Sequence, residues 1–133
     1  MKVMIVGCGR VGSVLANRLD EAKHHVVVLD RNQQAFRRLS ETFSGERIVG
    51  NGLIEDYVRP TLQEKTDMLF AMTDKDNINL MIVQKVKRHF QVGRVVAVVH
   101  DSILAGLYKE LDVETVCPTD LVLKELVPMA QEG

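Results

Sequence analysis

The chain has 133 residues, with 17 Lys and Arg against 18 Asp and Glu, four His, two Cys and no Trp. This length is that of one ordinary domain and is too short for a complete two-domain dehydrogenase. A net charge of −1 argues against a dedicated nucleic-acid-binding protein, which usually carries a basic face. Two cysteines cannot form a disulfide scaffold, and we find neither a membrane-spanning apolar run nor a signal-peptide pattern. We therefore expect one cytoplasmic globular domain.

Short apolar runs alternate with segments of helical periodicity along the chain. Runs rich in Val and Ile predict strands at residues 3–6, 26–29, 47–49, 68–72, 95–99 and 113–116. Apolar residues at helical spacing predict helices at 11–19, 36–43, 78–86 and 103–111, and residues 53–60 predict a loop with a short helix. The alternation predicts an α/β fold, a Rossmann-like doubly wound parallel six-stranded sheet, with residues 1–133 as a single domain.

A glycine motif, G-x-G-x-x-G, lies directly between the first predicted strand and the first predicted helix. Gly7 permits a tight turn, Gly9 lets the backbone approach a pyrophosphate, and Gly12 allows close helix–strand packing. The backbone N–H groups around Gly9 to Val11 would face the phosphates, and Arg10 can add a charge-assisted contact. The motif predicts a dinucleotide-phosphate site; a glycine turn needed only for packing is the alternative.

The second predicted strand ends at Asp30, which follows Gly12 by 18 residues. A carboxylate at this place accepts hydrogen bonds from the hydroxyls of an adenosine ribose and repels a 2′-phosphate, which disfavours NADP. A simple helix N-cap is the alternative role for Asp30. Arg31 can stack on the adenine or pair with phosphate, and a solvated side chain is equally compatible with the sequence.

Two polar clusters follow the third and fourth predicted strands, where a doubly wound sheet makes its ligand contacts. In Gly50–Gly52, the amide of Asn51 can read the adenine edge, because an amide both donates and accepts hydrogen bonds. In the second cluster, Thr73 or Asp74 can cap the next helix and line the phosphate side of the crevice. Helix capping alone is the alternative for either residue.

The segment 120–130 is apolar on nearly all sides, whereas a surface helix usually has one apolar stripe. Pro128 is expected to bend or end a helix here, because proline removes a helical hydrogen bond. Soluble monomers rarely expose large apolar patches. Residues 120–133 are therefore interpreted as a dimer-crossing or connecting helix; packing on the domain's own sheet is the alternative.

Taken together, four motifs resemble the nucleotide-binding N-terminal lobe of the Trk/Ktr potassium-uptake regulators and of the domains that regulate potassium-channel conductance (the RCK/KTN or TrkA-N family). They are Gly7–Gly12, Asp30, Gly50–Gly52 and Thr73–Asn79. The resemblance runs over essentially the whole chain, and the run T-D-x-D-x-x-N at Thr73–Asn79 is its most specific part.

The resemblance implies a cytosolic regulatory subunit that gates a potassium transporter or channel by binding NAD(H) or an adenine nucleotide such as ATP, ADP or AMP. It also implies homodimers or larger rings, docked on a membrane partner at the inner face of the membrane, with no nucleic acid bound and no direct membrane insertion. The predicted cofactor-binding residues are Gly7, Cys8, Gly9, Arg10, Val11, Gly12, Asp30, Arg31, Asn51, Gly52, Met72, Thr73, Asp74, Asn79 and His100.

Two positions depart from the family's pattern. Asn51 stands where Asp is frequent, which keeps a hydrogen-bond acceptor. An Arg is common near the end of the fifth strand, where this chain has His100. His100 can partly replace that Arg with a proton-dependent charge, or it is structural. The choice between NAD(H) and ATP or ADP stays open.

We find no catalytic or metal-binding pattern in the sequence. His24 and His25 are adjacent and point to different faces, and Cys8 and Cys117 form no C-x-x-C pair. Cys8 is expected to be a small buried filler, although a helix N-terminus can lower a thiol pKa. We therefore expect that the chain is not an enzyme. The alternatives are the cofactor-binding domain of an NAD-dependent oxidoreductase without its catalytic domain, and a dimerisation module with a vestigial pocket.

Overall fold

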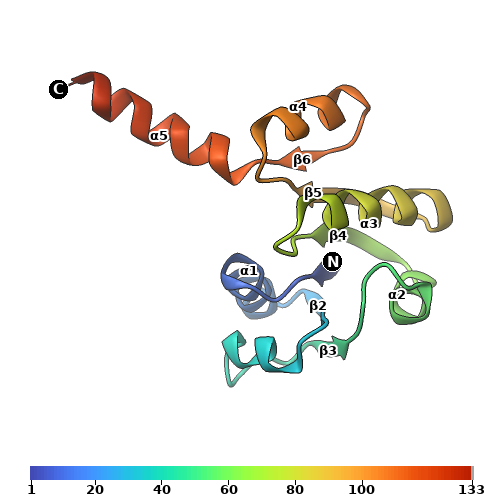
Figure 1. Cartoon of the computed structure of the whole chain (residues 1–133). Helices are drawn as coiled ribbons and strands as arrows, with labels where there is room; N and C mark the ends of the chain where they lie inside the picture. The colour runs from blue at the N-terminus through green and yellow to red at the C-terminus, as the bar shows by residue number, and fades with distance from the viewer. Residues whose placement is uncertain (133) are drawn as a thin grey trace.

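The computed structural model describes residues 1–132, which form one six-stranded, all-parallel sheet in the order β3-β2-β1-β4-β5-β6 (Figure 1). The strands are β1 Lys2–Val6, β2 His25–Asp30, β3 Glu46–Val49, β4 Thr66–Ala71, β5 Val92–Val98 and β6 Thr115–Val116. The helices are α1 Arg10–Glu21, the 3₁₀ helix η1 Gln33–Arg38, α2 Glu55–Leu62, α3 Asp76–His89, α4 Ser102–Glu110 and α5 Pro118–Glu132. The strand order reverses between β1 and β4, so the predicted Rossmann-like doubly wound sheet is confirmed.

The central strands are continuous apolar runs because both of their faces are covered. Every residue of Val3–Val6 and Val26–Leu29 is at most 2% exposed. Alternate residues of these strands pack on one side against α2, α3 and α4, and on the other side against α1 and η1 (Figure 1). This burial explains why the strands lack the polar alternation of a sheet with one wet face.

Two glycines let β1, α1 and the end of β4 approach one another closely. Gly7 has a φ of +114°, and a Cβ at this position would lie 2.5 Å from the carbonyl oxygen of Met72. A Cβ on Gly12 would overlap the carbonyl oxygen of Gly7. At Gly9, by contrast, an added Cβ would have no neighbour within 4 Å. Gly7 and Gly12 therefore serve packing, and Gly9 lies open to the crevice.

The helix predicted at residues 36–43 is wrong. The structure has the short 3₁₀ helix η1 here, and the chain is already extended at Leu39. The side chain of Asn32 accepts a hydrogen bond from the N–H of Gln34 and starts this turn, and the polar segment 40–45 forms turns rather than continuing the helix. Phe36 and Phe43 nevertheless pack in the core, which accounts for the helix-like apolar spacing.

The helix does not end at Pro128, because α5 continues through this residue to Glu132. Proline leaves one helical carbonyl without its intrahelical donor, and in an exposed helix water can bind that carbonyl. Gly133, the last residue of the segment predicted to cross or connect, lies outside the described residues. None of the described helices is long and apolar enough to span a membrane.

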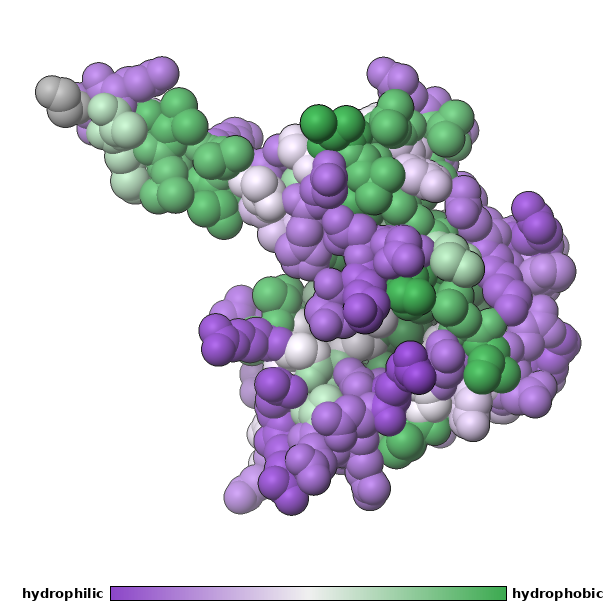
Figure 2. All heavy atoms as spheres, viewed as in Figure 1, coloured by the Kyte–Doolittle hydropathy of each residue, from purple (hydrophilic) through white to green (hydrophobic). Residues whose placement is uncertain are grey.

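Helix α5 projects away from the body of the domain (Figure 1), and none of its residues is buried. Its large apolar side chains, which are 45–62% exposed, are Leu121, Val122, Leu123, Leu126, Val127 and Met129. Figure 2 shows apolar surface along the projecting helix. In the described part of the chain, α5 therefore has no hydrophobic partner of its own.

We predict that replacing Gly12 with Ala lowers the free energy of unfolding by about 2–4 kcal/mol, because the new methyl group would overlap the Gly7 carbonyl and push α1 off β1. Urea denaturation measures this change. Gly106→Ala in α4 is the matched control, since an added Cβ there meets nothing within 4 Å. The control should be as stable as the unmodified chain or slightly more stable. Equal stability of the Gly12→Ala variant and the unmodified chain would contradict the packing role.

Candidate nucleotide-binding site

A cavity of about 330 Å³ opens at the carboxyl ends of β1, β2 and β4, where the strand order reverses. This is the place where open α/β sheets bind ligands, and the volume falls within the range of small-molecule sites. Ten of the predicted residues line it: Gly7, Cys8, Gly9, Asp30, Arg31, Asn51, Gly52, Met72, Thr73 and Asp74.

A second hollow, an apolar groove of about 580 Å³, adjoins the cavity and shares part of its wall. Gly9, Met72, Thr73 and Asp74 line both hollows. The groove also brings together four more of the predicted residues, namely Arg10, Val11, Gly12 and His100. The glycine loop and the start of α1 therefore separate an inner cavity from an outer groove.

Several residues that line the cavity were not predicted from the sequence. Arg38 comes from η1, Asn32 precedes that helix, and Ile78 and Ile82 form an apolar wall from α3. The spacing of the two isoleucines marked a buried helix face but not what that face meets. Nothing in the sequence marked Arg38 as a site residue, because its approach to the cavity depends on the 3₁₀ turn that the periodicity did not predict.

Asp30 is held rigidly at the mouth of the cavity. One carboxylate oxygen accepts a hydrogen bond from the backbone N–H of Cys8 at 2.8 Å, and the other accepts from the N–H of Asn32 at 2.8 Å. The helix N-cap role is taken by Asn32 instead, so the capping alternative for Asp30 is wrong. Because each oxygen has a further lone pair, the carboxylate can still accept hydrogen bonds from a sugar.

Cys8 is fully buried in the glycine loop, as expected for a small filler. Its thiol donates a hydrogen bond to the carbonyl of Ala35 at 3.4 Å. Burial, and then the negative charge of Asp30, raise the pKa of the Cys8 thiol above its ordinary value. The side chain is therefore a neutral thiol near pH 7, and its backbone N–H is the group that orients Asp30.

At the turn after β3, the side-chain oxygen Oδ1 of Asn51 accepts a hydrogen bond from the N–H of Leu53 at 2.9 Å. This bond orients the side chain, and its amide NH₂ keeps both N–H donors for a ligand. Gly52 lies against Val6 and Ile82 so closely that a Cβ would come within 2.7 Å of Val6. This contact brings the turn onto the floor of the cavity.

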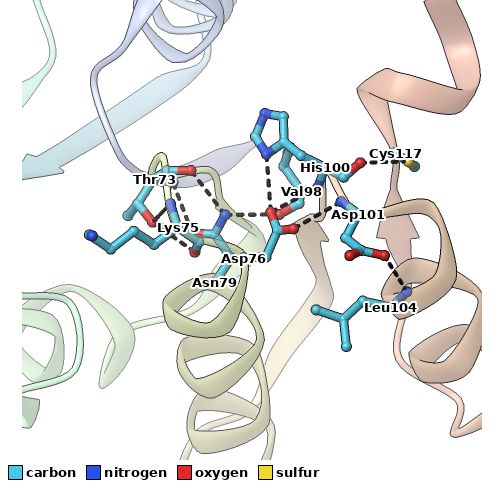
Figure 3. Close-up of polar contacts among 9 residues, drawn as sticks. All are labelled: Thr73, Lys75, Asp76, Asn79, Val98, His100, Asp101, Leu104 and Cys117. Carbon is cyan, nitrogen blue, oxygen red and sulfur yellow. Dashed lines mark hydrogen bonds and ion pairs between the residues drawn. The ribbon is translucent and has the colours of Figure 1, made fainter.

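Asn79 lies behind the cavity wall and does not line it. Its side chain is fully buried and makes four hydrogen bonds (Figure 3). The side-chain oxygen accepts from the N–H and hydroxyl of Thr73, at 2.9 and 2.6 Å, and the amide donates to the carbonyls of Thr73 and Val98, at 3.0 and 2.8 Å. Asn79 thus joins the ends of β4 and β5 and orients Thr73.

Asp76, which was not among the predicted site residues, holds the loop after β5. Its carboxylate accepts hydrogen bonds from the backbone N–H groups of His100 and Asp101, at 2.8 and 2.9 Å, and lies 3.1 Å from His100 Nδ1 (Figure 3). Partial burial alone would raise the pKa of Asp76, but the hydrogen bonds from His100 and Asp101 lower it below its ordinary value. In the T-D-x-D-x-x-N run, Asp76 and Asn79 therefore fix backbone geometry, and Thr73 and Asp74 line the crevice.

The site combines an acceptor for sugar hydroxyls, the N–H groups at the start of α1, arginines and an apolar wall. These groups can bind a sugar, a flat aromatic base and phosphates. Among residues 1–132, no three His, Cys, Asp or Glu side chains gather closely enough to hold a metal ion.

Comparison with known sequences identifies the family. Residues 3–119 match the model of the TrkA-N domain. The chain is 35% identical over 136 aligned residues to the Trk system potassium uptake protein TrkA of Streptomyces coelicolor, and the alignment covers 99% of this chain and 61% of that protein. The chain therefore spans about three fifths of the length of this relative.

Solved structures share the fold. The TrkA-N domain of the Escherichia coli inner membrane protein ybaL superposes with a TM-score of 0.82 at 19% identity, over 96% of this chain and 95% of that one. The Shewanella denitrificans Kef CTD, in its AMP-bound form, superposes with a TM-score of 0.76 at 23% identity, over 97% of this chain and 82% of that one. The GsuK channel bound to NAD superposes with a TM-score of 0.73 at 19% identity, over 88% of this chain and 21% of that one.

At these sequence identities the structural similarity shows only that the fold is shared, and the family assignment depends on the sequence matches. The family model covers most of the chain, and the similarity to the Streptomyces protein extends over nearly all of it. The chain belongs to the TrkA-N domain family.

Proposed function

We propose that this chain is a nucleotide-sensing regulatory domain that gates a membrane potassium transporter or channel by binding NAD(H) or an adenine nucleotide such as ATP, ADP or AMP. The observation that carries the proposal is the Asp30 carboxylate, held by the N–H of Cys8 at the mouth of the cavity and beside the glycine loop. In this proposal residues 1–133 act as a single nucleotide-binding domain.

The adenosine would occupy the cavity. Its ribose hydroxyls would bind Asp30, and its base would lie between the apolar wall of α3 and the side chains of Arg31, Arg38 and Asn51. The first phosphate would meet the free N–H groups at the start of α1, where the helix dipole is positive and Gly9 leaves open space. The AMP of the Kef structure and the NAD of the GsuK structure both contain this adenosine phosphate, which supports the ligand class.

The partner of the regulator would be a membrane protein that moves potassium, as the name of the Streptomyces relative suggests. The chain would then lie at the cytoplasmic face of the membrane through that partner. A ligand shifts a gating equilibrium only through different affinities for two arrangements of the assembly. The ligand would therefore have to contact a surface that differs between these arrangements.

Such a surface is the apolar groove beside the nucleotide cavity. It is lined by Phe70, Val96 and Val98 on the sheet, by Leu15 of α1, and by Leu121 at the start of α5. In the described part of the chain no helix covers this face of β4, β5 and β6, and α5 extends away from it (Figures 1 and 2). We propose that two copies exchange α5, each helix covering apolar surface of the other copy, to form a homodimer or part of a larger ring.

Replacing Asp30 with Ala is expected to weaken NADH and AMP binding by about 10–100-fold, because the ribose loses charge-assisted hydrogen bonds. Isothermal titration measures both affinities. The same change should narrow the preference for NADH over NADPH, since the carboxylate no longer repels the 2′-phosphate.

The control for Asp30→Ala is Asp56→Asn, at an exposed aspartate in the first turn of α2 and outside the cavity. It should leave all affinities unchanged. If the unmodified chain binds none of NAD, NADH, AMP, ADP and ATP more tightly than about 1 mM, the proposed function is wrong.

Replacing Leu126 with Glu is expected to convert a dimer into a monomer, because a charge would enter the apolar surface that α5 presents to the second copy. Sedimentation equilibrium measures the oligomeric state. Since Leu126 is half-exposed within one copy, the thermal stability of the monomer should hardly change. Lys124→Glu, on the same helix, is the control and should remain dimeric. A monomeric unmodified chain would contradict the helix exchange.

A further inference from the structure

Four exposed arginines surround the 3₁₀ helix η1 and the edge strand β3, and together they form the arginine edge: Arg31, Arg37, Arg38 and Arg47. Among residues 1–132, none of the four forms an ion pair with a carboxylate. Arg31 and Arg38 line the nucleotide cavity, whereas Arg37 and Arg47 line a separate hollow on the outer surface. The arginine edge therefore holds positive charge that the described chain does not neutralise.

The outer hollow between η1 and β3 has a volume of about 530 Å³. Its lining consists of two arginines, two glutamines and one aromatic ring, namely Arg37, Arg47, Gln33, Gln34 and Phe36. Guanidinium groups bind phosphate oxygens through paired N–H donors, and the glutamine amides add neutral donors. Since none of these lining residues is an Asp or Glu, the hollow fits a phosphate group.

Arg47 is held in place although it is exposed. Its guanidinium group lies over the ring of Phe43, 4.9 Å from the centroid, and this cation–π contact restricts the side chain. The carboxylates of the neighbouring segments have other partners: Asp20 accepts two hydrogen bonds from Ser44, and Glu46 pairs with a histidine of β2. The N–H donors of Arg47 thus remain for a ligand.

The charges of the chain are separated along the sheet. Residues 31–47 contain four Arg against two Glu, whereas residues 101–133 contain seven Asp and Glu against two Lys. Strand β3 lies at one edge of the sheet with η1 nearby, and β6, α4 and α5 lie at the opposite end (Figure 1). With a net charge of only −1, the chain is not attracted to polyanions as a whole, but this separation orients the arginine edge toward a negative surface.

We propose that the arginine edge is a docking surface for the headgroups of anionic phospholipids, with one lipid phosphate in the outer hollow between Arg37 and Arg47. This inference goes beyond the proposed function, in which the chain meets the membrane only through its partner. The contact is peripheral and stops at the headgroups, because four of the five side chains that line the hollow are polar. Each basic side chain close to such a surface strengthens the attraction about fivefold.

The arrangement of the arginines favours a membrane over an acidic peptide. They are spread around η1 and line two separate hollows, so a surface with many equivalent phosphates can meet several of them at once. A bound peptide usually needs an apolar pocket for an anchoring side chain. The outer hollow offers only the partly buried ring of Phe36 for this purpose.

Sedimentation of the full chain with lipid vesicles measures the contact. Vesicles of about 40% phosphatidylglycerol in phosphatidylcholine should retain the chain, and vesicles of phosphatidylcholine alone should not. Raising the salt concentration from about 0.1 M to about 0.5 M should release it, because exposed charges are then screened. The double variant Arg37→Gln/Arg47→Gln should need about 10–30-fold more lipid for half retention. Arg37→Lys/Arg47→Lys should bind nearly as well as the unmodified chain, because both charges remain.

The matched control is Arg88→Gln/Lys109→Gln, which removes two exposed positive charges from α3 and α4. It should bind the vesicles as the unmodified chain does, and an equal loss in both double variants would overturn the assigned surface. None of the four substituted residues lines the nucleotide cavity, so the affinities for AMP and NADH should stay the same in every variant. Failure of AMP and NADH to bind at all would overturn the proposed function and not this inference.

Soluble anions distinguish a membrane from other sources of negative charge. The probes are glycerol 3-phosphate and poly-glutamate. Binding of glycerol 3-phosphate without retention on phosphatidylglycerol vesicles would overturn the membrane surface in favour of a soluble phosphate. Binding of poly-glutamate more tightly than these vesicles, at equal concentration of negative charge, would overturn it in favour of an acidic protein.

Amide hydrogen exchange tests the same contact without a substitution. On phosphatidylglycerol vesicles, the amides of η1 and β3 should exchange more slowly, and those of α4 should be unchanged. Protection that is absent, or equal at both ends of the sheet, would contradict docking through the arginine edge.

Discussion

The close contact between Gly12 and the carbonyl oxygen of Gly7 is the constraint on which the site depends. With no side chain at either residue, the first turn of α1 can lie directly against the end of β1. Its free N–H groups then open onto the crevice where the strand order reverses, and Gly9 leaves that crevice unobstructed. A larger residue at Gly12 would move the helix dipole and the phosphate site together, so packing and function share one requirement.

Two carboxylates hold the backbone in place at opposite ends of the crevice. Asp30 joins the end of β2 to the glycine loop, and Asp76 joins the start of α3 to the loop after β5. Each accepts two backbone N–H groups, and Asn79 ties the strands between them. Because these bonds join groups of the chain itself, binding a ligand costs less conformational entropy than it would for mobile loops. The two ends still differ in chemistry: Asp30 lines the nucleotide cavity, whereas the Asp76 carboxylate lies beside the imidazole of His100.

The nucleotide cavity and the uncovered apolar groove share a wall made of Gly9, Met72, Thr73 and Asp74. In the proposed function, a ligand that contacts this wall would also alter the surface on which a second copy would pack. Ligand binding and assembly would then influence each other through residues common to both hollows. Helix α5 supports this view, because its apolar side chains find no cover within the described chain (Figure 2).

Local spacing in the sequence determined the alternating strands and helices, the glycine loop and Asp30, because these features depend on residues close together in the chain. Only the tertiary structure decided which residues far apart in the sequence meet at the ends of the strands. Arg38, Ile78 and Ile82 reach the cavity only because η1 packs beside β2 and α3 packs beside β4 and β5, and Asp76 acts on His100 across 24 residues of sequence.

The errors have the same origin. The apolar spacing of Phe36, Leu39 and Phe43 is that of an α-helix, but their burial comes from packing around a 3₁₀ turn that Asn32 starts. Pro128 would end a helix packed in a core, yet α5 is exposed and water can bind the carbonyl that proline leaves unpaired. Periodicity reports which side chains avoid water, and only the folded chain decides which neighbours they meet.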